Sequence, residues 1–305
     1  MAQRPPRNAG LNIHQPYSFF LEKEVDLSGL SIDSATILLT NKECPWRCLM
    51  CDLWKNTTVR SVPLRAIPEQ IAFALKNFPI GPAQLKLYNS GSFFDSAAIP
   101  VADYTEIAKL VESARHVIVE SHPRLVGQKT LFFRNLLSPS LEVAIGLETI
   151  HPRVLPLLNK RFDLGHFQAA THFLAAEGIA IRAFILVNPP FLNEKEGIDW
   201  AVRSAEFAFS CGAAVVSLIP TRAGNGAMER LQETGEFTPP GIPNLEQAFE
   251  RALDLKAGRV FADIWDIDKM PGCQVCREQR TQRLQAMNLA QTCLPAIRCS
   301  ACSPA

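Results

Sequence analysis

Short apolar runs alternate along the chain with stretches whose apolar positions recur at helical spacing. The runs are rich in Val, Ile and Leu and nearly continuous, which is typical of strands buried beneath helices. They predict six strands, at residues 34–40, 83–90, 116–121, 141–149, 179–187 and 213–220. The helical pattern predicts helices at residues 66–78, 102–114, 123–137, 164–178, 194–212 and 245–258.

This alternation is typical of parallel β–α–β units. Six units suit a partial (β/α)6 TIM-like barrel better than a closed eightfold one, so the predicted fold class is α/β. We expect an N-terminal extension with little regular structure over residues 1–33, the barrel over 34–258, and a Cys-rich, metal-binding C-terminal extension over 259–305. In such barrels the chemistry lies at the carboxyl ends of the strands.

Composition narrows the class of protein. Of 305 residues, 47% are hydrophobic and 20% are charged, and the formal net charge is +1. These values exclude disorder as the main state and disfavour a globally basic nucleic-acid binder, although a local basic patch remains possible. No apolar run reaches the roughly 18–20 residues of a membrane span, and the N-terminus lacks the apolar core of a secretory signal. We therefore expect a cytoplasmic protein that does not contact the membrane.

Eight of the nine cysteines are clustered, which indicates metal chemistry rather than a disulfide framework. Cys44, Cys48 and Cys51 follow the first predicted strand with the spacing C-x3-C-x2-C. Four cysteines normally hold a [4Fe–4S] cluster, so three leave one iron free for a ligand that is not protein. A zinc ion held by these three thiolates and a distant fourth ligand is the alternative.

This spacing, after the first strand of a partial barrel, resembles the signature of the radical SAM superfamily. The resemblance implies a [4Fe–4S] cluster on Cys44, Cys48 and Cys51, with S-adenosylmethionine (SAM) chelated by the fourth iron. It also implies an electron donor, because one electron cleaves SAM to a 5′-deoxyadenosyl radical that abstracts hydrogen from a substrate. The residue before the third cysteine lies near the adenine in this superfamily and is usually aromatic; here it is Met50.

The resemblance also places SAM contacts on two loops that follow strands. The segment Asn89, Ser90, Gly91 and Ser92 stands where the superfamily has a Gly-Gly-Glu motif that holds the SAM amino group. Asn188 opens a proline-rich loop where the superfamily packs the adenine. An ordinary turn is the alternative for the first of these segments.

Charged residues at strand ends supply further candidates. Glu120 and Glu148 end the third and fourth strands, and a carboxylate buried there is costly unless it is paired. They resemble contacts to SAM or to the substrate, and structural salt bridges are the alternative. Arg161 resembles the cation that meets the SAM carboxylate in related enzymes, because an arginine fork matches a carboxylate. A solvated helix cap is the alternative for Arg161.

Two C-x2-C pairs near the C-terminus form a strong zinc signal. An auxiliary iron–sulfur cluster is the alternative, and Cys293 is a possible substitute for one ligand. Arg277, Arg280 and Arg283 lie between the pairs at helical spacing and predict either a solvated face or contacts to phosphates. The four expected ligands are Cys273, Cys276, Cys299 and Cys302.

Several segments together narrow the resemblance. CPWRCLMCDLW, YNSGSFFD, IGLET, LNKRF, VNPPFLNEKEGIDWA and MNLAQ resemble archaeosine synthase radical SAM subunits and Elp3-like radical SAM proteins, over about residues 35–302. This resemblance implies a partner protein and C–N cleavage on a lysine-bearing 7-deazaguanine in tRNA. A radical SAM enzyme acting on a small metabolite or peptide, and a non-catalytic metal-binding module, are the alternatives.

Overall fold

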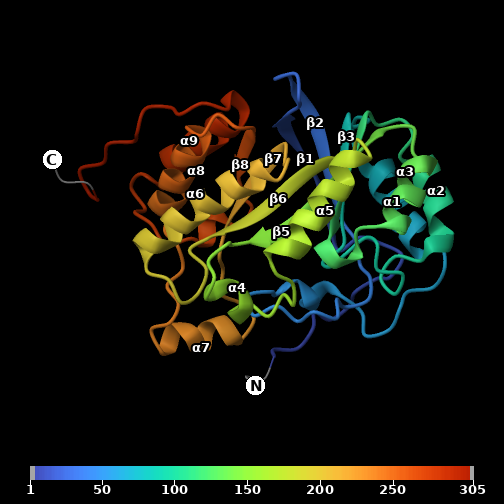
Figure 1. Cartoon of the computed structure of the whole chain (residues 1–305), viewed down its shortest axis with the longest axis horizontal. Helices are drawn as coiled ribbons and strands as arrows, with labels where there is room; N and C mark the ends of the chain where they lie inside the picture. Colours follow the sequence, from blue (N-terminus) through green and yellow to red (C-terminus); the bar gives the residue numbers. More distant parts are fainter. Residues whose placement is uncertain (1–3, 303–305) are drawn as a thin grey trace. The chain divides into compact units, whose positions relative to one another are not determined.

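The computed structural model describes residues 4–302, and its strands succeed one another in the sheet in chain order, β1 to β8 (Figure 1). Residues 1–3 of the predicted N-terminal extension and residues 303–305 of the predicted C-terminal extension lie outside this range. The strands are β1 Ser18–Val25, β2 Ser31–Leu38, β3 Gln84–Tyr88, β4 His116–Ser121, β5 Ser140–Glu148, β6 Ala180–Val187, β7 Val215–Pro220 and β8 Arg259–Ala262. The helices are α1 Ala66–Asn77, α2 Tyr104–Leu110, α3 Gln128–Leu136, α4 Val154–Leu157, α5 Leu164–Ala176, α6 Glu194–Ser210, α7 Ala227–Glu233, α8 Ile242–Leu253 and α9 Arg277–Ala290.

The chain divides into two compact units, of which one comprises residues 5–146 and 159–182. In this unit β1 pairs antiparallel with β2, and β2, β3, β4 and β5 pair in parallel. The carboxyl ends of the parallel strands therefore share one edge of the sheet. The loop after β2 holds the first three cysteines, and the loop after β3 holds residues 89–92.

The other unit contains residues 147–158 and everything described after residue 182. Here β7 pairs in parallel with β8, while α8 packs against both strands and against α6 (Figure 1). The α6 helix begins at a reciprocal cap, in which the Asn193 side chain accepts from the Glu196 amide at 3.0 Å and Glu196 accepts from the Asn193 amide at 3.1 Å. Helix α9 lies beside β8 and carries the Cys-rich end of the chain.

The predicted fold class is confirmed, since strands and helices alternate in a partial (β/α) barrel and a cysteine cluster follows it. The expectation of little regular structure before residue 34 is wrong, because β1 lies there. Its alternation is hidden because Glu24 faces inward and pairs with Lys86 and Arg182. A further strand, β8, lies where the alternation was expected to stop, and the predicted helix over 123–137 begins as a short 3-10 turn before α3.

Charged residues form part of the interior of the first unit. Arg182 lies 2.5 Å from Glu24 and 2.6 Å from Glu142, and both carboxylates are almost fully buried. Burial favours the neutral carboxyl, but the Arg182 guanidinium outweighs it and lowers the pKa of Glu142 to about 2. The network therefore stays ionised and fixes four strands relative to one another, because Lys86 on β3 also joins it.

Candidate functional site

Cys44, Cys48 and Cys51 lie on the loop that leaves the carboxyl end of β2. The Cys51 amide donates to the Cys48 carbonyl at 3.2 Å, and Met50 is half-buried in that turn. Burial raises the pKa of Cys44 and of Cys51 to about 12, and the neighbouring sulfurs add to the effect by repulsion. These thiols are therefore protonated at neutral pH until a metal displaces the protons.

The loop over residues 89–92 passes directly against the first cysteine. A Cβ added at Gly91 would lie 3.2 Å from the Cβ of Cys44, so the close approach depends on glycine. Glu120, at the end of β4, accepts hydrogen bonds from the amides of Asn89 and Gly91. Burial raises the pKa of Glu120 to about 7 against the effect of these N–H donors. Glu120 therefore positions the loop.

Asn89 is fully buried, with 0% of its surface exposed, yet neither polar atom of its amide has a hydrogen-bond partner among residues 4–302. Its neighbours are satisfied, since the Ser90 hydroxyl lies 3.2 Å from the Tyr17 hydroxyl and Ser92 accepts from the His122 amide at 3.2 Å. An unpaired buried donor or acceptor costs roughly 1–3 kcal/mol. A buried amide without partners is therefore a candidate contact for a bound group.

A clamp from the segment after α4 holds the cysteine loop. The Asn159 side chain donates to the Arg47 carbonyl at 3.0 Å, and the Trp46 ring stacks on His122 with centroids 4.1 Å apart. His122 in turn bonds the Lys160 carbonyl at 2.8 Å. Burial lowers the pKa of His122 to about 4, so the stacked imidazole is neutral at pH 7.

The structure separates the roles of two adjacent cations. Arg161, the expected carboxylate partner, has an exposed side chain, whereas Lys160 is only 8% exposed. The Lys160 charge acts on both Cys44 and Glu120, opposing the rise in pKa that burial causes in each. Sequence reasoning missed Lys160 because nothing in a Lys-Arg pair indicates which side chain turns inward.

Residues 5–17 form a strap beside the cysteine loop that the sequence did not indicate. Arg7 pairs with Glu43, the residue before the first cysteine, and the Tyr17 hydroxyl contacts Ser90. Burial raises the pKa of Tyr17 to about 12, so the phenol remains neutral. The strap thus contacts both loops of the candidate site, and its polar composition carries no periodic signal.

The other two candidates, Glu148 and Asn188, lie in the second unit. Glu148 ends β5 with φ at 66°, and Asn188 follows β6 with φ at 56°. Asn188 donates to the Thr238 carbonyl at 2.7 Å, but its side-chain oxygen is buried without a partner in the described part of the chain. A Cβ at Gly197 would lie 2.0 Å from that oxygen, which explains a glycine within α6.

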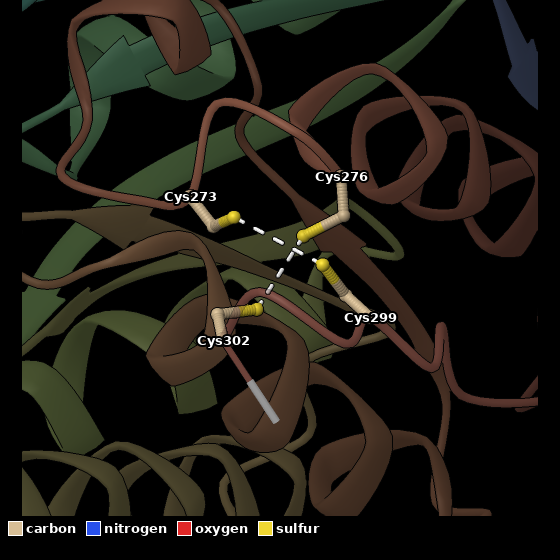
Figure 2. Close-up of side chains that lie close together, drawn as sticks. All are labelled: Cys273, Cys276, Cys299 and Cys302. Atoms are coloured by element: carbon tan, nitrogen blue, oxygen red, sulfur yellow. Dashed lines mark hydrogen bonds between the residues drawn. The ribbon is translucent and has the colours of Figure 1, made fainter. Parts of the chain in front are cut away.

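Four cysteines converge near the C-terminus (Figure 2). Their sulfur atoms lie within 4.8 Å of one another, with 3.6 Å between Cys276 and Cys302 and 4.0 Å between Cys273 and Cys299. These distances exceed the roughly 2.05 Å of a disulfide bond. They bracket the edge of about 3.8 Å expected for four thiolates at 2.3 Å from one tetrahedral ion.

The arginines of α9 are bonded within the protein. Arg280 donates to the Cys276 sulfur at 3.2 Å, Arg283 donates to the Pro295 carbonyl at 2.8 Å, and Arg277 donates to the Ile267 carbonyl at 2.8 Å. The expectation of a solvated or phosphate-binding face on this helix is therefore wrong. Cys293 lies outside the cluster, 3.5 Å from the Glu250 carbonyl.

No protein-family model matches the chain. It is 24% identical over 222 residues to an uncharacterized protein of Methanocaldococcus jannaschii, covering 68% of this chain and 61% of that protein. It is 23% identical over 284 residues to an archaeosine synthase subunit beta of Methanosarcina acetivorans, covering 87% and 81%. The chain thus spans about three fifths of the first relative's length.

Two solved structures share the fold. Elp3 of Methanocaldococcus infernus aligns with a TM-score of 0.53 at 14% identity, covering 73% of this chain and 59% of that one. Streptococcus suis SuiB bound to S-adenosylmethionine aligns with a TM-score of 0.53 at 10% identity, covering 77% and 50%. The chain resembles the radical SAM superfamily. The expectation that it is an enzyme of this superfamily agrees with these comparisons. In residues 4–302 no helix is both long and apolar enough to span a membrane.

Proposed function

We propose that the chain is a radical SAM enzyme in which Cys44, Cys48 and Cys51 hold a [4Fe–4S] cluster. The observation that carries the proposal is the buried, unpartnered amide of Asn89, on the loop whose Gly91 touches Cys44. When bound, the cluster and SAM supply an electron and a 5′-deoxyadenosyl radical for hydrogen abstraction.

The residues around the loop have distinct tasks in this proposal. The Asn89 amide offers one donor and one acceptor to the carboxylate and amino groups of SAM. Lys160 supplies the buried positive charge that a carboxylate beside Cys44 requires. Glu120 and Ser92 fix the loop backbone, Ser90 carries the Tyr17 contact, and Met50 offers an apolar surface to the adenine.

Three further sequence candidates stay proposals. Glu148 and Asn188 lie buried at strand ends, and the side-chain oxygen of Asn188 lacks a partner among the described residues. We assign both to cofactor or substrate contacts on that basis. Arg161 is exposed, so its proposed contact with the SAM carboxylate passes to Lys160.

The substrate we propose is a lysine-bearing 7-deazaguanine in tRNA, from which a C–N bond is cleaved. The support is the similarity to archaeosine synthase subunit beta, which extends over 284 residues. That relative is a subunit, which supports a partner protein for this chain. The electron for SAM cleavage requires a reductant. On the same grounds we place the protein in the cytoplasm.

We also propose that Cys273, Cys276, Cys299 and Cys302 hold one zinc ion. The sulfur distances of 3.6 and 4.0 Å support a single ion, because cluster ligands sit on separate irons and lie farther apart. The backbone amide of Ala301 lowers the pKa of Cys299 to about 7, which favours the thiolate that zinc requires. Elemental analysis of the purified protein tests this, and iron at this site in a variant lacking the first three cysteines would contradict it.

The test of function is formation of 5′-deoxyadenosine by anaerobically reconstituted protein with SAM and a strong reductant, with and without tRNA that carries the lysine-bearing precursor base. We expect turnover that rises with tRNA carrying the precursor base. The triple variant in which Cys44, Cys48 and Cys51 become Ala should lose all turnover, while Cys293→Ser, an exposed cysteine outside both groups, should retain it. Turnover in the triple variant would contradict the proposal, and stimulation by small metabolites or peptides alone would redirect the substrate.

A further inference from the structure

Three exposed arginines lie on or beside the cysteine loop of the first unit. Arg47 lies within the loop, and its carbonyl accepts from the Asn159 side chain at 3.0 Å. Arg161 lies two residues after Asn159, and its carbonyl accepts from the Arg124 guanidinium at 3.1 Å. The three exposed arginines therefore lie on segments that are joined at one short clamp, although these segments are separate in the chain.

None of the three has an acidic partner among residues 4–302. Arg65 and Arg222, by contrast, do have acidic partners, since Arg65 lies 3.0 Å from Glu106 and Arg222 lies 2.7 Å from Asp263. Exposed guanidinium groups without an acidic partner, carried on adjoining segments, favour an anionic ligand.

The backbone of the clamp is unusual at the same places. Arg47, Asn159 and Arg161 adopt positive φ values of 50°, 56° and 57°. Such conformations are costly for residues with a Cβ and persist where the surroundings impose them, often at functional sites. The backbone is thus constrained at Arg47, which accepts the Asn159 bond, and at Arg161, two residues after Asn159.

We propose that Arg47, Arg124 and Arg161 form a phosphate-binding patch that holds the RNA backbone beside the cysteine loop. This inference rests on the proposed tRNA substrate. The net charge of +1 gives no global attraction for a polyanion, and the arginines of α9 are bonded internally, so a local patch must supply it. Guanidinium forks bind phosphate oxygens in pairs, and the proposed tRNA substrate favours RNA as the ligand.

The test is the salt dependence of binding of an unmodified tRNA transcript. Each phosphate contact contributes about 0.7–0.9 to the slope of log affinity against log salt concentration. Three contacts therefore weaken binding by about 20- to 40-fold between about 50 and about 200 mM salt. The double variant Arg47→Gln/Arg124→Gln should lower the slope by about 1.4–1.8, and Arg47→Lys/Arg124→Lys should restore most of it.

The matched control is Arg115→Gln, which removes an exposed arginine immediately before β4, at the opposite end of that strand from Glu120. It should leave the slope unchanged. Formation of 5′-deoxyadenosine without tRNA should also be unchanged in the double Gln variant, which shows that the cluster is intact. Salt-dependent binding lost with the arginines, in a protein that never cleaves SAM, would support the patch while sinking the proposed function.

Two results would overturn the patch. One is a double Gln variant that binds tRNA with the wild-type slope. The other is unchanged tRNA binding together with turnover lost only when a protein reductant replaces dithionite, since that result assigns the arginines to an acidic electron carrier.

Discussion

The unpartnered amide of Asn89 predicts a conflict between stability and binding that can be measured. Replacing Asn89 with Leu, a side chain of similar volume, removes a buried donor and a buried acceptor that have no partners in the described chain. Each unpaired group costs roughly 1–3 kcal/mol, and imperfect packing of the new side chain offsets about 1 kcal/mol of the stability gained by removing them. The variant should therefore be more stable than the wild type when no cofactor is bound.

The expected gain is about 1–5 kcal/mol, which corresponds to a rise in melting temperature of about 2–8 °C for a chain of this size. The same variant should bind SAM at least about tenfold more weakly, because it loses hydrogen bonds to charged groups worth more than about 1.4 kcal/mol. Thermal unfolding of the cofactor-free protein and equilibrium binding of SAM to the reconstituted protein measure the two effects separately.

The matched control, Asn288→Leu, should change the stability in the opposite direction. Asn288 is satisfied, since it accepts from the Ala262 amide at 2.8 Å and donates to the Ala262 carbonyl at 3.0 Å. Asn288→Leu leaves both backbone groups unpaired and should destabilise the protein without changing SAM affinity. If Asn89→Leu lowers the melting temperature and leaves SAM binding unchanged, the amide is not a ligand-binding group and the reasoning fails.

Three further predictions concern single charged groups. Arg182 holds the pKa of Glu142 near 2, against an ordinary value of about 4.3. The ionised Glu142 therefore stabilises the fold fully above about pH 4.3, and this stabilisation is lost as the pH falls towards 2. In urea unfolding across this range, the stability of Glu142→Gln should depend less on pH than that of the wild type. Arg280→Met removes a donor to the Cys276 sulfur and should raise the rate of zinc transfer to a chelator by about 10- to 100-fold. Lys160→Met should weaken SAM binding by about tenfold or more, whereas Arg161→Met should change it by less than about threefold, so equal effects would contradict the assignment of Lys160.

Features that depend on local spacing were predictable from the sequence. The strand over 116–121 and the helix over 66–78 follow from apolar periodicity, and β4 and α1 occupy almost those residues. The C-terminal cysteines were predictable because two C-x2-C turns each present a pair of thiols to one ion. In each case the information lies within a few neighbouring residues.

Features that depend on a distant partner were not predictable in the same way. Strand β1 places Glu24 toward the interior, and only the presence of Lys86 and Arg182 on other strands makes that burial tolerable. A pattern that counts apolar positions scores such a strand as polar. The arginines of α9 show the converse, because helical spacing suggested a solvated face while Glu246 and backbone carbonyls satisfy them internally.

The same distinction separates the cysteines from the groups around them. Ligand spacing is enough to propose Cys44, Cys48 and Cys51 as cluster ligands, because all three lie on one short loop. Which cation turns toward that loop depends on the clamp, where the His122 bond to the Lys160 carbonyl and the positive φ of Arg161 send adjacent side chains in different directions. One exposed arginine and one buried lysine thus arise from a single Lys-Arg pair, which is why we propose different anions for them: the carboxylate of the cofactor for Lys160 and the phosphate backbone for Arg161.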